Sequence, residues 1–201
     1  MTRADALPAR DRLIEATKRL IWQRGIEATS PGAILTESGV GQGSLYHHFT
    51  GKPELAATAA ASLATDLQAE TDVVLGDEEA TAMERVHAYL DKQRDALSGC
   101  RLGRLAFDPG RDAQTGAPIA AYFAGLQRTL TSLLDDARID GDLTDVIDTG
   151  ALASAIVACV QGGYVLAAAT QDPDAMAQAM LGIRHLLDAA APHRRRNHRP
   201  R

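Results

Sequence analysis

Apolar residues near the N-terminus recur at helical spacing. Leu13, Ala16 and Leu20 stand three, four and seven positions apart, with charged residues between them. This spacing puts the apolar side chains on one face, so we predict an amphipathic helix over 11–24. Gly25 follows directly, and glycine is the residue that most often ends a helix.

Two short helices and a long one are predicted next. Ser30 before Pro31 is the order of an N-cap and a first helical residue, and Gly39 ends this second helix. A third helix is expected over 42–49, and a fourth over 52–75. Three helices in so short a stretch, with a glycine-containing turn between the second and third, indicate a helix-turn-helix.

The rest of the chain keeps a helical pattern up to residue 190. No segment shows the clean alternation of apolar and polar residues that marks a strand. A short apolar segment at 102–107 precedes a predicted loop at 108–118, rich in glycine, proline and aspartate. The remaining helices are predicted over 80–98, 119–139, 149–170 and 174–190. The predicted fold class is therefore all-α.

Residues 151–170 carry no charge, which raises the alternative of a membrane span. The stretch is mostly alanine, contains Ser154, Gln161 and two glycines, and lacks basic or aromatic flanks. We therefore predict a buried helix and no membrane partner.

The formal net charge of −5 is distributed unevenly. Residues 1–53 carry +2, residues 54–192 carry −12 and residues 193–201 carry +5. Residues 1–53, here called the head, are basic, whereas residues 54–192 are acidic. Phosphates of a nucleic acid would attract the head and repel the acidic residues, and so orient the head toward the nucleic acid. The arginine-rich end is predicted to be a disordered tail, with added non-specific DNA affinity as the alternative.

Cysteine usage and the N-terminal residues bear on location. Cys100 and Cys159 are too few for a disulfide framework, so we expect reduced thiols, with a redox pair as the alternative. The first residues contain no apolar core of a secretory signal. The expected location is the cytoplasm.

Residues 39–49 carry most of the predicted chemistry. A recognition helix must bring its first turn close to base edges, and Gly43 and Ser44 leave room for that approach. Gln42 can form two hydrogen bonds to adenine, and Leu45 and Phe49 would anchor the helix to the core. Long side chains nearby can reach backbone phosphates. The predicted DNA-binding residues are Ser30, Gln42, Gly43, Ser44, Tyr46, His47 and Lys52.

The segment from Leu13 to about Leu55 resembles the TetR family of regulators. The residues that carry the resemblance are Gly25, Ala28-Thr29-Ser30, Ile34, Gly39-Val40, Gly43 to Phe49, and Lys52. Two departures from the family concern the capping of its helices. Gly41 stands where Ser or Thr is usual, and no acidic residue lies near Ala33 to complete a capping box. Gln42 replaces a common lysine, so the DNA sequence preference does not carry over from relatives.

The resemblance implies a homodimer that binds a pseudo-palindromic operator in double-stranded DNA, usually as a repressor. It also implies a small-molecule effector, apolar or aromatic, that moves the fourth helix and changes the spacing of the two heads. Residues 1–53 would then be the helix-turn-helix DNA-binding domain. Residues 54–192 would be the helical effector-binding and dimerisation domain, and 193–201 the basic tail.

The turn at 99–106 is further similar to a glycine-cysteine turn in TetR-type repressors of the LmrA/YxaF kind, which are associated with drug and flavonoid-like effectors. Arg104 stands here in place of the usual asparagine.

Apolar residues at helical spacing in the last two predicted helices form the predicted dimer surface. Two recognition helices must meet grooves about one helical turn, ~34 Å, apart, which requires a symmetric pair. Packing within one chain is the alternative for each residue. The predicted interface residues are Leu152, Ile156, Val160, Met176, Met180, Ile183 and Leu187.

An effector pocket needs apolar walls with a few polar groups. A place in the ordinary core is the alternative for each candidate, above all for His87, which lies in an apolar stripe. The predicted effector-binding residues are Leu63, Leu67, His87, Leu90, Leu105, Tyr122, Phe123, Leu126, Cys159 and Tyr164.

Nothing in the sequence indicates an enzyme. No Gly-x-Ser-x-Gly motif is present, and the glycines at 39, 41 and 43 follow no predicted strand. His47 and His48 lack partners at metal-ligand spacing. We therefore predict no catalysis, no metal and no cofactor.

A DNA-binding regulator without a small-molecule effector is the rival function. A filled C-terminal core would favour that rival, whereas a cavity of several hundred cubic ångströms would favour a sensor. Activation in place of repression stays open, because the position of the operator decides between them.

Overall fold

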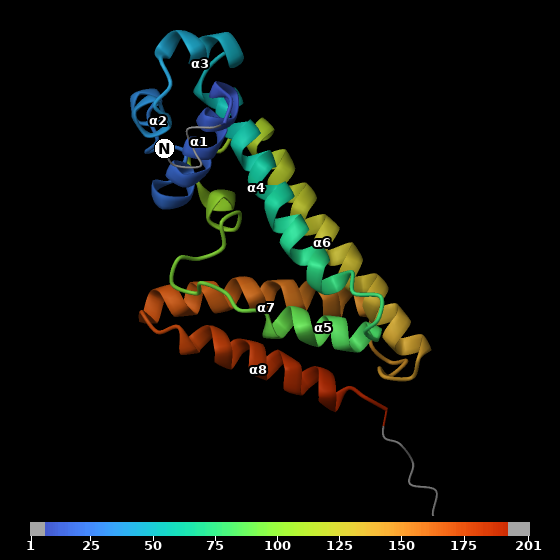
Figure 1. Ribbon diagram of the computed structural model, residues 1–201. Helices are drawn as coiled ribbons and strands as arrows, with labels where there is room; N and C mark the ends of the chain where they lie inside the picture. The colour runs from blue at the N-terminus through green and yellow to red at the C-terminus, as the bar shows by residue number, and fades with distance from the viewer. Residues whose placement is uncertain (1–6, 193–201) are drawn as a thin grey trace, which may run out of the picture. The chain divides into compact units, whose positions relative to one another are not determined.

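The computed structural model describes residues 7–192, and every regular element in that range is helical (Figure 1). The predicted all-α class is confirmed. The predicted tail at 193–201 lies outside the described residues. The elements are α1 (Ala9–Arg24), α2 (Pro31–Ser38), α3 (Gln42–His48), α4 (Lys52–Leu75), α5 (Ala82–Asp91), the 3₁₀ helix η2 (Arg104–Phe107), α6 (Ala113–Ile139), α7 (Thr149–Thr170) and α8 (Asp174–Ala189).

By packing, the chain divides into two compact units. The first runs to Glu70 and includes Gly99–Gly125, and the second comprises Thr71–Ser98 and the residues from Leu126 onward. The start of α4 belongs to the first unit because Leu55 is buried there against the head. The functional boundary after residue 53 stays a prediction.

In the first unit, α1, α2 and α3 enclose a small apolar core, here called the head core. Its members come from the apolar faces that the sequence pattern predicted. Burying each large side chain contributes roughly 1.5–3 kcal/mol. The head core comprises Leu13, Ile14, Leu20, Ile34, Val40, Leu45, Phe49 and Leu55.

The same unit contains a second apolar cluster, here called the Leu105 cluster. It joins the end of α1 and the first half of α4 to η2 and the start of α6. Its buried members are Ile21, Ile26, Ala56, Ala59, Leu63, Leu102, Leu105 and Ile119. Partly buried side chains packed against it are Ala64, Leu67, Cys100, Ala106, Tyr122 and Phe123.

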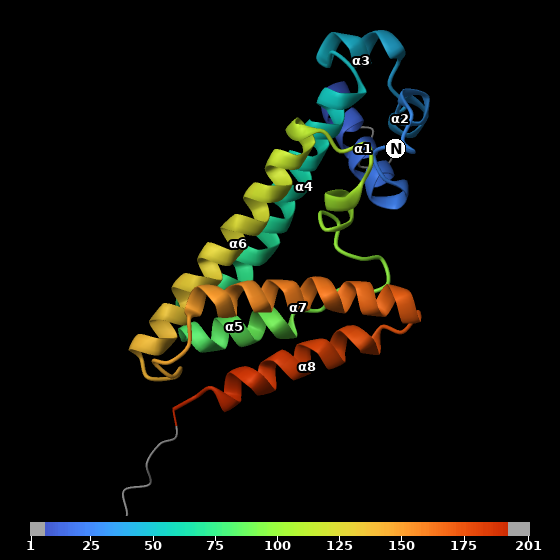
Figure 2. The same cartoon turned by 180° about the vertical axis from the view of Figure 1, so that it is seen from behind.

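In the second unit, α8 runs alongside α7 and also contacts α5 (Figure 2). Gly163 permits a close approach of the two long helices, since a Cβ there would lie 2.6 Å from the sulfur of Met176. α7 is the one helix in residues 7–192 whose length and apolar composition would allow it to cross a membrane. One of its faces, including Ile156 and Val160, is instead buried inside the chain.

Two predicted element ends were wrong by more than two residues. α5 stops at Asp91 rather than near 98, because the Arg94 guanidinium folds back onto the carbonyl oxygens of Tyr89 and Leu90 at 2.5 and 3.0 Å. These hydrogen bonds satisfy acceptors at the helix end.

α6 begins at Ala113, inside the predicted loop at 108–118. Asp112 accepts the Thr115 N–H at 2.8 Å and so starts the helix ahead of Pro118. Pro118 lies inside the helix, beyond its first turn, where proline lacks the backbone donor for one helical hydrogen bond and crowds the carbonyl oxygen of Gln114.

Candidate nucleic-acid interface

The turn between α2 and α3 is fixed by local hydrogen bonds. Ser30 Oγ accepts the Ala33 N–H at 3.2 Å and caps α2, which is half of the capping box that the sequence cannot complete. Gly39 takes the left-handed conformation with φ +63°, where a side chain would be strained. Ser38 Oγ then accepts the Val40 N–H at 3.3 Å.

α3 presents polar side chains outward and apolar ones inward. Leu45 and Phe49 are 2% and 3% exposed in the head core, whereas Tyr46 is 56% exposed. Gln42 and His47 are also exposed. The buried pair fixes the helix, so the polar side chains are held on a rigid base.

Glycine at position 43 is not required by the fold. A Cβ built on Gly43 meets no atom within 4 Å, and φ there is not in the left-handed region. The exposed surface at the start of α3 is therefore open, which suits close approach of a duplex to the helix. Ser44 beside it is half-buried.

Lys52 opens α4, and its ammonium donates to the Glu27 carbonyl oxygen at 3.2 Å. The lysine is thereby held beside the α1–α2 turn. The same corner is fastened by Glu54, whose carboxylate accepts the backbone N–H and the hydroxyl of Thr50 at 2.6 and 2.7 Å. These hydrogen bonds lower the pKa of Glu54.

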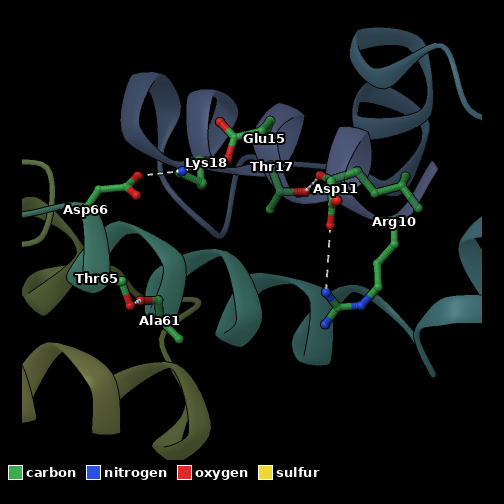
Figure 3. Close-up of polar contacts among 9 residues, drawn as sticks. Arg10, Asp11, Glu15, Thr17, Lys18, Ala61, Thr65 and Asp66 are labelled. Atoms are coloured by element: carbon green, nitrogen blue, oxygen red, sulfur yellow. Dashed lines mark hydrogen bonds and ion pairs between the residues drawn. The ribbon is translucent and has the colours of Figure 1, made fainter. Parts of the chain in front are cut away.

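α1 is tied to α4 by a largely buried lysine. The Lys18 ammonium lies 2.6 Å from Asp66 of α4 and 2.7 Å from Glu15, and Figure 3 shows it directed at Asp66. Burial by itself lowers the pKa of Lys18, but the hydrogen bonds and charges of Asp66 and Glu15 outweigh it. The pKa of Lys18 therefore lies above its ordinary value.

Sequence reasoning missed three contacts that hold the head together. Arg19 pairs with Glu37 at 2.9 Å between α1 and α2, and the Arg10 guanidinium lies 5.5 Å from the Phe49 ring centroid. Asp108 accepts hydrogen bonds from the backbone at Ile26 and Glu27, 82 and 81 positions away. Such separations leave no periodic pattern in the sequence.

Half of the predicted effector residues gather in the first unit. They belong to the Leu105 cluster, where the rings of Tyr122 and Phe123 meet edge to face with centroids 5.2 Å apart. Both rings are half-buried. The predicted residues in this cluster are Leu63, Leu67, Leu105, Tyr122 and Phe123.

The other predicted effector residues belong to the second unit. His87 lies 3.3 Å from Asp188, and the Cys159 thiol donates to the Ala179 carbonyl oxygen at 3.4 Å between α7 and α8. Burial raises the pKa of Cys159. Leu90 and Leu126 are buried and Tyr164 is half-buried.

The second unit also contains an open cavity of about 570 Å³. Of the predicted effector residues, Leu90 lines it. Segment 90–96 and the first half of α8 form its walls, with Met176, Met180 and Leu181 apolar and Arg184 paired with Asp91.

Most of the predicted dimer residues on α7 and α8 are buried inside the chain. This is the alternative that the sequence left open. Leu152 is half-buried, and the buried ones are Ile156, Val160, Met176, Met180, Ile183 and Leu187. The same two helices leave other large apolar side chains exposed, namely Val165, Leu166, Leu181 and Leu186.

No group of three or more His, Cys, Asp or Glu side chains within residues 7–192 is arranged to hold a metal ion. The thiols of Cys100 and Cys159 are both free.

Family models match most of the chain. Residues 13–59 match the model described as bacterial regulatory proteins, tetR family. Residues 80–183 match the model described as tetracyclin repressor-like, C-terminal domain. The first match contains the whole of α2 and α3, and the second contains α5, α6 and α7.

Curated relatives and solved structures agree with these matches. An uncharacterised HTH-type transcriptional regulator of Mycobacterium tuberculosis is 28% identical over 196 residues, covering 93% of this chain and 98% of the relative. One from Lactococcus lactis is 25% identical over 170 residues, covering 81% and 85%.

The fold is similar to that of E. coli NemR in its reduced form, with a TM-score of 0.81, 19% identity, and coverage of 89% of this chain and 96% of that one. The regulatory protein TetR from Rhodobacter sphaeroides gives a TM-score of 0.76 at 21% identity, with coverage of 88% and 97%.

Proposed function

The chain belongs to the TetR family of bacterial regulatory proteins, and on that premise we propose that it is a repressor that binds a pseudo-palindromic DNA operator as a homodimer. A small apolar or aromatic effector releases it from the operator. The observation that carries the proposal is α3, a short helix anchored by buried Leu45 and Phe49 whose exposed side chains are polar.

Within this proposal, α3 enters the major groove. Gln42, exposed at the first position of the helix, is the base-reading residue, since its amide can both donate to and accept from adenine. Open space around Gly43 lets the helix approach the base edges.

The other candidates bind the DNA backbone. Tyr46 and His47 are exposed on the same helix, Ser44 lies beside them, and Ser30 and Lys52 stand at the starts of α2 and α4. Hydroxyl, imidazole and ammonium groups in such places donate to phosphate oxygens and so fix the register of the protein on the duplex.

The exposed apolar side chains of α7 and α8 supply the dimer surface. Val165 and Leu166 on α7, and Leu181 and Leu186 on α8, are 45–68% exposed in the single chain. Large apolar side chains left in water on two adjacent helices favour burial against a second copy. A symmetric pair of these helices then gives the two heads required by a palindromic site.

An effector is supported by the composition of the Leu105 cluster. Two half-buried aromatic rings and a half-buried cysteine lie against an otherwise aliphatic core, which suits an apolar or aromatic ligand. The protein would meet both effector and operator in the cytoplasm. A regulator without an effector is the second candidate. It is favoured by the burial of Leu63 and Leu105, 3% and 1% exposed, whereas the open cavity of about 570 Å³ in the second unit favours a sensor. Activation is a further alternative, since no residue decides the position of the operator.

The family consists of regulators, and we propose no enzymatic role. The function is tested by titrating the purified protein with duplexes from around its own gene and with a random duplex, over a range of salt concentrations. A specific operator is expected to be bound about 10³-fold or more tighter than the random duplex. Equal weak binding to every duplex tested, including a library of genomic fragments, would contradict the proposed function.

A further inference from the structure

Asp108, in the loop after η2, holds the α1–α2 turn with both of its carboxylate oxygens. Oδ2 accepts the Ile26 N–H at 2.8 Å, and Oδ1 accepts the Glu27 N–H at 3.1 Å. Oδ1 also accepts the Gly110 N–H at 2.8 Å, which orients the carboxylate. Hydrogen bonds to an ionised acceptor are stronger than those between neutral groups.

Glycines line both sides of this contact. A Cβ on Gly25 would lie 2.3 Å from Asp108 Oδ2, and Gly25 has φ +87°. A Cβ on Gly110 would lie 2.8 Å from the Glu27 backbone nitrogen. The loop and the turn can approach this closely only because neither glycine carries a side chain.

The turn held by Asp108 also positions proposed DNA-contacting groups. The Glu27 carbonyl oxygen accepts the Lys52 ammonium at 3.2 Å. The Thr29 hydroxyl donates to the Gly25 carbonyl oxygen at 2.6 Å, and Ser30 follows as the cap of α2. A shift of the backbone at 26–27 would therefore displace both Lys52 and Ser30.

At its other end the Asp108 loop is joined to the Leu105 cluster. The Asp108 N–H donates to the Leu105 carbonyl oxygen at 3.2 Å, and Leu105 is 1% exposed. Phe123 packs half-buried against the same cluster. A rearrangement around Leu105 therefore moves the residue that holds the head.

We propose that Asp108 is a positioning residue that couples the Leu105 cluster to the α1–α2 turn and thereby to the DNA-contacting groups. This inference rests on the proposed function, and it names the residue through which a change in the cluster acts. This path runs through the loop after η2.

The contact itself is tested by amide hydrogen exchange in full-length Asp108→Asn and Asp108→Ala. Exchange at Ile26 and Glu27 should accelerate by about tenfold or more in Asp108→Ala, with Asp108→Asn intermediate because the amide oxygen still accepts one bond. Asp112→Asn is the matched control, since Asp112 is a carboxylate of the same loop that bonds only within its own segment, to Thr115. Unchanged exchange at Ile26 and Glu27 in both Asp108 variants would overturn the contact.

Coupling is tested by combining Phe123→Ala with Asp108→Ala and measuring exchange at Thr29 and Ala33. With Asp108 present, Phe123→Ala should change exchange at these two amides by about threefold or more. The change should be clearly smaller in the double variant, where only the direct contact of Ile26 with the Leu105 cluster is left. Additive effects of the two substitutions, or no effect of Phe123→Ala, would overturn the coupling.

The DNA affinity of the wild type, Asp108→Ala, Phe123→Ala and the double variant is measured as well, so that failure of this inference can be distinguished from failure of the proposed function. Specific binding by the wild type together with additive exchange effects would reject the coupling alone. Absence of specific binding by the wild type would reject the proposed function, while the exchange measurements would still decide the role of Asp108.

Discussion

The Lys18 ammonium lies 2.6 Å from the Asp66 carboxylate and so joins α1, the first helix of the head, to α4 (Figure 3). The lysine side chain is 11% exposed and the aspartate 43%, so water screens one end of the pair but not the other. Removing one partner from such a pair costs more than at an exposed pair and less than at a fully buried one, where the remaining charge would be left without compensation.

Asp66→Asn should therefore lower the free energy of unfolding by about 1 kcal/mol, because Lys18 keeps Glu15 as its second partner. The measurement is urea unfolding at neutral pH. Glu37→Gln is the control, since it breaks the exposed pair with Arg19 and should cost less than about 0.5 kcal/mol. If Asp66→Asn and Glu37→Gln lower the free energy of unfolding equally, burial of Lys18 does not strengthen its ion pair.

The same lysine predicts how stability depends on pH. The pKa of Lys18 is raised above 10.5 in the folded protein, so the folded state retains the proton more strongly than the unfolded chain. The contribution of Lys18 to the free energy of unfolding is complete below pH 10.5, and it is lost as the pH rises through the folded-state pKa of Lys18. The difference in stability between wild type and Lys18→Met should thus narrow in strong alkali. Lys18→Arg should keep its stability there, because arginine does not titrate in this range. A difference that stays constant from pH 8 to 11 would contradict the assignment.

The sequence was sufficient for most of the fold because local signals agree with the packing. Ser30 before Pro31, and the glycine at 39, mark the bounds of α2 that the structure shows. The apolar spacing of 149–170 gives α7 residue for residue. Prediction from the sequence failed where a side chain forms hydrogen bonds with backbone outside its own predicted pattern. Arg94 ends α5 by returning to carbonyl oxygens, and no periodicity reports that.

The site was predictable to a smaller extent. The exposure of Gln42, Tyr46 and His47 follows from their positions around a helix whose buried face is Leu45 and Phe49. Helical spacing could not decide which apolar side chains of α7 and α8 meet their own chain, because α7 is uncharged all round and α8 carries Leu181 and Leu186 outside its buried stripe. The contact of Asp108 with Ile26 and Glu27 was beyond prediction, since these partners lie over eighty positions away.

Lys52→Met should weaken binding to every duplex alike. It should also reduce the slope of log affinity against log salt concentration by about 1, which corresponds to one counterion fewer released. Methionine keeps the length of the side chain but removes the charge that phosphate attracts. Affinities for operator and random duplex are measured from low to high salt. Lys92→Met removes the same charge from the second unit and should leave the salt slope unchanged. An unaltered slope in Lys52→Met would remove this residue from the set of phosphate contacts.

Gln42→Ala should change which DNA sequences are preferred more than it changes total affinity. Losing two hydrogen bonds to one base costs roughly 1–3 kcal/mol of discrimination at that base pair. Selection of bound sequences from a random duplex library gives the consensus for each protein. Tyr46→Phe is the control, because loss of a phosphate contact lowers affinity without changing the consensus. An identical consensus for Gln42→Ala and wild type would rule out Gln42 as a base reader.

Leu186→Glu should shift the dimer toward monomer, since it places a charge on a side chain that is 68% exposed on α8 and that we propose is buried by a second copy. Because the residue faces water in the single chain, the substitution should leave the fold of the monomer intact. Sedimentation equilibrium gives the dissociation constant, which should rise by about tenfold or more. Val146→Glu is the matched control, as it introduces the same charge at a side chain that is 89% exposed in the loop before α7. If Val146→Glu dissociates the dimer and Leu186→Glu does not, the dimer surface lies at that loop and not on the exposed face of α8.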